Sequence, residues 1–177
     1  YEIRLSLVGS EMCNKRQTLN INVLRSESVG SIHIQSSNPV TPPAIKFNFM
    51  SSPYDKDGTV AAMRKARELF ATSPLASAVG EELAPGIQCQ SDNDMVEWIK
   101  NNAETTYHPV GTCKMGSDPL AVVDNELCVH GISGLRVADA SIMPTLTSGN
   151  TNAPSIMIGE KCALMMLTKA KMERKAA

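Results

Sequence analysis

The chain has 177 residues, of which 42% are apolar and 20% are charged, and its formal net charge is −1. This composition is typical of a folded globular domain and excludes the disordered classes, and with acids and bases balanced and no basic run we expect no nucleic-acid partner. Because no apolar run reaches the ~18 residues that a spanning helix needs, we also expect no membrane span.

Five cysteines are scattered along the chain and no CxxC pair occurs. Such spacing predicts reduced, buried thiols in a cytoplasmic protein rather than a disulfide framework. The chain opens at Tyr1 without an initiating methionine and enters a strand-like pattern at once, so we expect it to be part of a longer protein.

Residues 2–49 predict β-structure, because polar and apolar side chains alternate there in short runs. The runs cover residues 2–8, 19–24, 32–34 and 45–49. A period of two is typical of an antiparallel sheet that has one covered face. Turn residues separate the runs, and the proline-rich stretch 38–43 is the longest of these breaks.

A helix is predicted next, with Asp55 and Asp57 as N-cap or first-turn acids. Its apolar stripe has helical spacing and consists of Val60, Met63, Ala66 and Leu69 or Phe70. Thr72-Ser73-Pro74 ends it, and residues 75–90 predict a loop or a short helix.

A second, shorter helix is predicted to begin at Ser91 as the N-cap. Asp94 follows three residues later, which gives the spacing of a capping box with Asp in place of Glu or Gln. Met95, Trp98 and Ile99 would form the buried face of this helix.

The stretch from Tyr107 to Gly116 is rich in proline and glycine, so it predicts a structured loop that carries His108. Residues 122–124 and 126–129 predict short extended pieces, and residues 135–139 predict a short buried strand. The last helix is expected to start after Asn152, with Pro154 in its first turn. Its side chains are apolar almost all round, which predicts burial on most sides.

His108 is a candidate general base, because loops of this kind place side chains and imidazole titrates near neutral pH. A structural role for this histidine remains open on the sequence alone. The small polar residues 148–152 before the last helix suit either contact with a ligand at the helix N-terminus or a plain N-cap. No GxSxG motif, zinc-ligand spacing or GxGxxG fingerprint occurs in the chain.

Three segments together resemble the carboxyl-terminal part of a glucose-methanol-choline (GMC) oxidoreductase of the choline dehydrogenase-like branch. They read YHPVGTCKMG at 107–116, GLRVADASIMP at 134–144 and GNTNAPSIMIGEK at 149–161. The resemblance implies an α+β fold, in which an antiparallel substrate-binding domain (residues 1–105) is flanked by helices. The His loop and a strand-loop-helix segment (residues 106–177) would complete the FAD-binding domain, whose amino-terminal dinucleotide-binding part is absent here.

The resemblance also implies roles for individual residues. His108 matches the histidine that takes the hydroxyl proton of an alcohol as its carbon passes a hydride to flavin N5. Asn150 matches the second active-site position, which would hydrogen-bond the substrate oxygen. Residues matching the cofactor contacts of the family are Asp139, Ala140, Thr151, Asn152 and Ala153.

The chain is therefore expected to be part of an FAD-dependent oxidoreductase that acts on a small-molecule alcohol and is inactive alone. Its missing partner would be the amino-terminal FAD-binding part of the same protein, and no metal site is expected. Two alternatives stay open: a hydroxynitrile lyase-type member of the family, which uses the flavin site without net redox, and a non-catalytic binding or structural domain.

Overall fold

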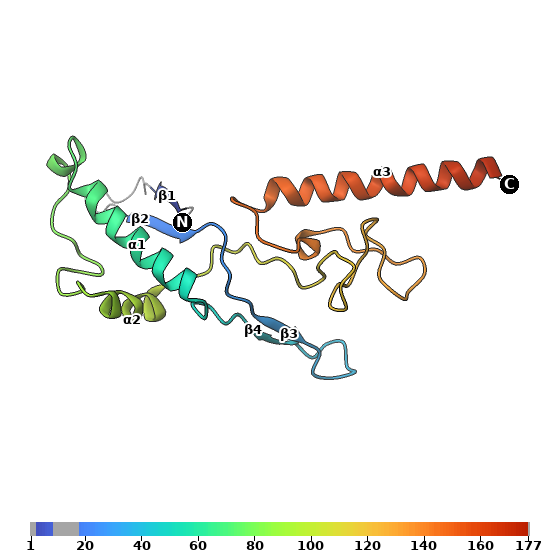
Figure 1. Cartoon of the computed structure of the whole chain (residues 1–177), viewed down its shortest axis with the longest axis horizontal. Coiled ribbons are helices and arrows are strands. Elements are labelled where there is room, and N and C mark those ends of the chain that lie inside the picture. The colour runs from blue at the N-terminus through green and yellow to red at the C-terminus, as the bar shows by residue number, and fades with distance from the viewer. Residues whose placement is uncertain (1–2, 9–17, 177) are drawn as a thin grey trace. The chain divides into compact units, whose positions relative to one another are not determined.

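The computed structural model describes residues 3–8 and 18–176. The chain divides into two compact units, Tyr1–Glu104 and Thr105–Ala177 (Figure 1). Among the described residues, the first unit holds four strands and two α-helices, and the second is mainly irregular chain followed by one long helix. In the described part of the chain, no helix is both long and apolar enough to cross a membrane.

The first sheet of unit 1 consists of β1 (Ile3–Val8) and β2 (Thr18–Val23), which pair antiparallel with Leu5 opposite Ile21. Helix α1 packs on β2, and Ile21 contacts the core that α1 helps to form. An antiparallel pair with one face covered by a helix is what the alternating pattern predicts, and the α+β class is confirmed.

The second sheet pairs β3 (Ser31–His33) with β4 (Ala44–Lys46), and all six residues are exposed. These strands pair antiparallel, as the alternation predicts, but they form a hairpin separate from β1 and β2, and neither of its faces is covered. Strand β4 ends early because Asn48 and Met50 take left-handed backbone angles, with φ of 57° and 58°, which a strand does not accept. The side chains of Phe47 and Phe49 stack beside it, with ring centroids 5.0 Å apart.

Helix α1 (Pro53–Phe70) begins two residues before Asp55. Its N-cap is Ser52, whose hydroxyl accepts a hydrogen bond from the backbone N–H of Tyr54. Asp55 lies in the first turn as a buried residue, so its N-cap alternative is wrong, and Asp57 is an exposed residue of the helix.

The core of unit 1 lies between α1 and α2 (Asp92–Asn102). Met95 is fully buried there beside Val60, Met63, Cys89 and Ile99. The predicted capping box of α2 is confirmed, because the Ser91 hydroxyl accepts from the N–H of Asp94 and the Asp94 carboxylate accepts from the N–H of Ser91, each at 3.1 Å.

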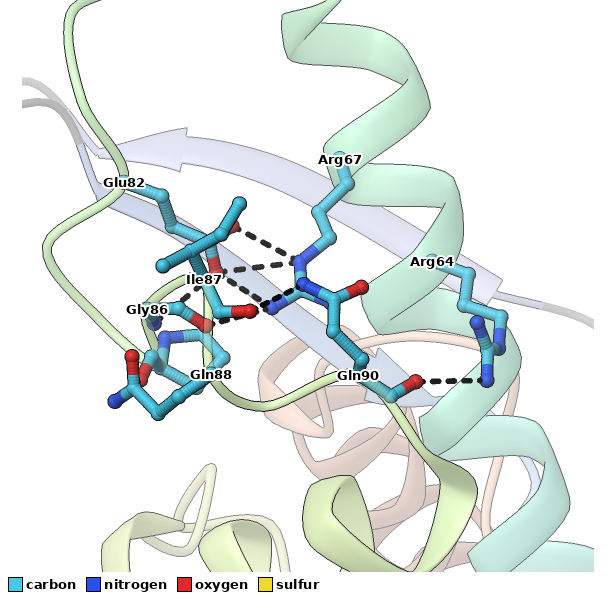
Figure 2. Close-up of polar contacts among 8 residues, drawn as sticks. Arg64, Arg67, Glu82, Gly86, Ile87, Gln88 and Gln90 are labelled. Carbon is cyan, nitrogen blue, oxygen red and sulfur yellow. Dashed lines mark hydrogen bonds and ion pairs between the residues drawn. The ribbon is translucent and has the colours of Figure 1, made fainter.

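The segment between the two helices contains the short 3-10 helix η1 (Leu75–Ser77) and a loop that α1 holds in place. Figure 2 shows Arg67 of α1 directed at this loop. Its Nε donates to both carboxylate oxygens of Glu82, at 3.0 and 3.2 Å, and its guanidinium also donates to the carbonyl of Gly86 at 3.2 Å.

Unit 2 has little regular structure before its long helix. Residues 127–129 pair with residues 135–137 through hydrogen bonds from Val129 N to Leu135 O and from Val137 N to Leu127 O. The predicted buried strand at 135–139 is wrong, because only one isolated bridge forms, at Arg136, and Leu135 is 49% exposed. In the described residues no further strand extends this pairing, so a ladder does not develop.

The core of unit 2 gathers six buried residues around the start of helix α3 (Asn152–Ala176). They are Val123, Leu127, Ile142, Met143, Ile158 and Cys162. Helix α3 was expected to be buried on most sides, and this is wrong for the chain described here, because Ile156 and Leu167 are each 60% exposed. The face that carries Ile158 and Cys162 packs against the core of unit 2.

Candidate active site

The site lies in unit 2 and begins with the loop that carries His108. The backbone of Tyr107, directly before it, is left-handed, with φ of 61°, and the Tyr107 side chain is 75% exposed. The Tyr107 N–H donates to Thr105 Oγ1 at 3.1 Å, and Pro109 restricts His108 to extended backbone angles. A non-glycine residue in this region stores backbone strain, and such strain is typical of positions that aim a functional side chain.

Backbone hydrogen bonds fix the rest of the loop to the segment after residue 139. The N–H of Cys113 donates to the carbonyl of Ser141 at 3.0 Å, and the N–H of Met115 donates to that of Ile142 at 2.8 Å. Gly111, with φ of 87°, provides the turn between His108 and the bonded residues Cys113 and Met115. A Cβ at Gly111 would lie 3.4 Å from the carbonyl oxygen of Met143. The first and second motif segments are therefore held together by main-chain contacts.

The third motif segment is joined to the loop by a side-chain hydrogen bond. His108 Nδ1 lies 2.9 Å from the hydroxyl oxygen of Thr151, although 43 residues separate the two in sequence. Thr151 is buried, with 8% exposure, and His108 is half-buried. This contact brings the loop histidine to the start of α3, where Asn150 is the direct neighbour of Thr151.

The first turn of α3 presents small, exposed residues beside this contact. Asn152 and Ala153 are exposed, and their backbone N–H groups have no carbonyl four residues earlier within the helix. The partial positive charge of a helix N-terminus adds to these donors. The arrangement suits a ligand with an anionic or carbonyl edge.

Asp139 and Ala140 lie at the start of the 3-10 helix η2 (Ala140–Ile142). The Asp139 carboxylate accepts from the N–H of Ser141 at 2.8 Å and so caps this helix, while the residue itself remains exposed. Its connection to His108 runs through the backbone bonds between η2 and the loop. Asp139 is thus placed next to the site by the chain, and a direct part in proton transfer does not follow from its position.

Other charged groups of unit 2 stabilise turns. His130 Nε2 lies 3.0 Å from the carbonyl of Gly116, so this histidine holds a turn of unit 2. Lys114 Nζ lies 2.9 Å from both oxygens of Asp118, and this hydrogen bond is the main reason why the pKa of Asp118 is below its ordinary value. Within the described residues, no group of three His, Cys, Asp or Glu side chains is placed to hold a metal ion.

The role of the Thr151 side chain is the feature that sequence reasoning missed. The motif placed Thr151 among the cofactor contacts, whereas the structure directs its hydroxyl at His108. A signal was present in Pro154, because a proline three residues after an N-cap removes one of the N–H groups that the cap hydroxyl normally binds.

Comparisons with known proteins bear on the resemblance that the three motif segments carry. A family model described as GMC oxidoreductase matches residues 26–159. An oxygen-dependent choline dehydrogenase from Escherichia coli O127:H6 (strain E2348/69 / EPEC) is 47% identical over 158 residues, which are 89% of this chain and 28% of the relative. The resemblance expected from the three motifs is thereby confirmed.

Two solved structures are also similar to this chain. Pyridoxine 4-oxidase from Mesorbium loti is 33% identical with a TM-score of 0.78, over 83% of this chain and 29% of the oxidase. An FAD-dependent oxidoreductase from Chaetomium thermophilum is 28% identical with a TM-score of 0.75, over 80% of this chain and 25% of that protein. The chain therefore spans less than a third of the length of the proteins that it matches.

Proposed function

We propose, since this chain belongs to the GMC oxidoreductase family, that it forms the active-site part of an FAD-dependent enzyme that oxidises an alcohol to a carbonyl. The contact between His108 and Thr151 carries the proposal, because it joins the loop histidine to the residue that follows Asn150. The names of the relatives, a choline dehydrogenase and a pyridoxine oxidase, support an alcohol-type substrate.

His108 is the general base in this proposal. Its Nδ1 is engaged by Thr151, so Nε2 is the ring nitrogen left to take the hydroxyl proton of the substrate. Asn150 donates a hydrogen bond from its side-chain amide to the substrate oxygen and stabilises the negative charge that develops there. An asparagine at this position leaves His108 as the single base of the pair.

The residues at the start of α3 fit a flavin. The backbone N–H groups of Asn152 and Ala153, with the dipole of a 25-residue helix behind them, suit the carbonyl edge of an isoalloxazine ring. We propose that Thr151 contributes to this cradle through its backbone and that Asp139 and Ala140 contact FAD from η2. When bound, FAD supplies the hydride acceptor for the alcohol carbon.

The two parts of the chain would then have different roles. Residues 1–105 would form the substrate-binding domain, and residues 106–177 would complete the FAD-binding domain. The exposed apolar side chains of α3, such as Ile156 and Leu164, would pack against the FAD-binding remainder of the protein, since the chain covers 28% of the curated relative. Alone, the chain would be inactive.

The test is flavin reduction by a panel of alcohols without oxygen, in the complete protein that carries this chain. His108→Gln is expected to slow flavin bleaching by roughly 10²–10⁴-fold, the usual contribution of a general base. His130→Gln is the matched control, because it removes an exposed imidazole of the same unit and keeps a donor for the carbonyl of Gly116. This control is expected to bleach at the rate of the unmodified protein.

Three outcomes would contradict the proposal. If the complete protein bound no FAD, the proposed flavin-dependent activity would be excluded. Turnover of a cyanohydrin without bleaching would favour the lyase alternative. Equal bleaching rates in the His108→Gln and His130→Gln variants would remove His108 from the reaction and favour a structural role.

A further inference from the structure

The hydrogen bond between His108 and Thr151 has a direction that decides whether the histidine can act as a base. A neutral imidazole carries its proton on either Nδ1 or Nε2, and the partner of one nitrogen selects the tautomer. A threonine hydroxyl can accept from Nδ1–H or donate to an unprotonated Nδ1. Only the first arrangement leaves a lone pair on Nε2.

We infer that Thr151 is a positioning residue whose hydroxyl accepts the Nδ1 proton of His108 and so keeps the Nε2 lone pair free for the substrate. This inference rests on the proposed function, because it specifies how the proposed base is kept in its active form. It assigns the Thr151 side chain to the histidine, while the backbone of Thr151 remains part of the proposed flavin cradle.

The helix start explains why the hydroxyl is available. In α1 and α2 the capping serines accept from the helix backbone, Ser52 from Tyr54 N and Ser91 from Asp94 N, each at 3.1 Å. The third helical position, which Asp94 occupies in α2, is Pro154 in α3, and a proline has no N–H to donate. The Thr151 hydroxyl therefore lacks one of the two backbone donors that usually occupy a cap side chain.

The rest of Thr151 is held firmly. Its carbonyl accepts from the backbone N–H of Ser155 at 3.0 Å and from the Ser155 hydroxyl at 2.6 Å. The side chain is buried, and a β-branched residue has few χ1 rotamers, so the hydroxyl cannot easily turn away from His108. Tyr107 and Pro109 restrict the backbone on the other side of the contact, so the main chain that carries His108 is also constrained.

The expected effect of substituting Thr151 depends on whether its role is that of a structural cap or of a positioning residue. Removing the hydroxyl of a structural cap would lower stability and leave the tautomer of His108 unchanged. Removing the hydroxyl of a positioning residue would leave the Nδ1 proton of His108 without its acceptor, so both tautomers would become populated. The conservative pair Thr151→Val and Thr151→Ser separates these cases, because Val keeps the branched shape without the hydroxyl and Ser keeps the hydroxyl.

The first measurement is the tautomer itself. The complete protein is labelled with ¹⁵N-histidine, and the His108 signals are assigned by their loss in His108→Gln. The unmodified protein and Thr151→Ser are expected to show a protonated Nδ1 and an unprotonated Nε2, and Thr151→Val a mixture of both tautomers. A protonated Nε2 in the unmodified protein would overturn the inference even if neither Thr151 variant folds.

The second measurement is steady-state turnover with the same flavin content in each variant. Thr151→Val is expected to lower kcat by about 10- to 100-fold with little change in KM, because a misdirected base weakens proton removal and not substrate binding. Thr151→Ser is expected to stay within about 3-fold. If kcat is unchanged in Thr151→Val but lowered in His108→Gln, only the role of Thr151 is overturned. If kcat is unchanged in His108→Gln, the proposed function is overturned.

Discussion

A single buried carboxylate, that of Asp55, joins the chain before β3 to the first turn of α1. It accepts hydrogen bonds from the Ser26 hydroxyl at 2.6 Å and from the backbone N–H groups of Glu27 and Ser28 at 3.0 and 2.8 Å. Burial by itself raises the pKa of this carboxyl, but the hydrogen bonds from Ser26, Glu27 and Ser28 together outweigh it and lower the pKa below the ordinary aspartate value. The charged form is therefore part of the folded structure.

Asp55 should make the stability of unit 1 depend on pH. Because its pKa is lower in the folded state, its contribution is fully present above the ordinary aspartate value of about 4 and is lost as pH falls through the folded value. Asp55→Ala is expected to cost on the order of 1–3 kcal/mol at pH 7, since three donors lose the buried, charged acceptor that they share. Urea unfolding at several pH values measures this cost.

The matched control for Asp55 is Asp57→Ala, because Asp57 lies exposed in the same helix. This substitution is expected to change the free energy of unfolding by no more than about 0.5 kcal/mol. The cost of Asp55→Ala should also shrink as the pH falls below the ordinary aspartate pKa. An equal cost at acid and neutral pH would show that the charge of Asp55 does not contribute.

For single residues, the sequence identified the candidate functional side chains, but it did not identify the residues that these side chains contact. His108 and Asn150 stand in dense local motifs, so their candidacy could be read from neighbouring residues. The partner of His108, Thr151, lies 43 residues away, and no local pattern encodes a contact of that separation. Asp55 was expected near the helix start, but its bonds to residues 26–28 depend on how two distant segments fold together.

Among the elements, α2 has the start that was easiest to predict from sequence. The capping box between Ser91 and Asp94 satisfies two backbone donors that the helix would otherwise leave free. Ser91→Ala is expected to lower the free energy of unfolding by about 1 kcal/mol, whereas Ser91→Thr, which keeps a hydroxyl, should cost less. Thermal unfolding of both variants measures the difference, and equal losses would show that the hydroxyl contributes nothing.

The loop between α1 and α2 depends on Arg67 (Figure 2). Its side chain and that of Glu82 are partly buried, and the guanidinium binds both carboxylate oxygens. Arg67→Lys is expected to loosen the loop, because a lysine cannot reproduce the paired contacts and the bond to the carbonyl of Gly86. Hydrogen exchange at the backbone N–H of Gly86, which donates to Glu82, should become faster.

Arg64 provides the comparison for Arg67. It is an exposed residue of the same helix and pairs with Asp92. Arg64→Lys is expected to leave the exchange of the Gly86 N–H unchanged, since exposed ion pairs contribute little. Equal exchange in Arg67→Lys and the unmodified protein would mean that the loop keeps its conformation without the paired contact.

Element types were more predictable than element burial. The sequence predicts α3 as a helix, and this is confirmed. Its apolar composition also predicts burial, but Ile156 and Leu167 are largely exposed. Residues 135–139 likewise predict a buried strand, but they form an isolated bridge at Arg136 instead. Apolar patterning reports which surface an element can bury, and it carries no information on whether the covering surface belongs to the same chain.

For the molecule as a whole, exposed apolar side chains occur in both units. In unit 1 they include Ile45 and Phe49 near the β3–β4 hairpin, and in unit 2 they follow α3, where Leu164 is 58% exposed. Exposed apolar surface of this extent is typical of an interaction site. We therefore expect the α3 surface to be covered in the complete protein.

One substitution compared in two contexts tests this expectation. Leu164→Glu should change the stability of the isolated chain little, because the side chain is already exposed there. In the complete protein it should lower Tm by several degrees and reduce retained FAD, because it would bury a charge. The control is Lys161→Glu, at an exposed polar position of the same helix. An equal effect of Leu164→Glu in both contexts would show that this face stays uncovered.

The main-chain hydrogen bonds between the His loop and η2 have a consequence for how this site can evolve. The bonds from Cys113 N to Ser141 O and from Met115 N to Ile142 O depend on backbone atoms, so they survive exchange of the side chains that surround them. At the half-exposed positions Lys114 and Ser141 the side chain can therefore be exchanged while these bonds are kept, although a change at Lys114 removes its bond to Asp118. Variant libraries at these two positions are expected to retain the His108-dependent activity, because the bonds that hold the loop use main-chain atoms.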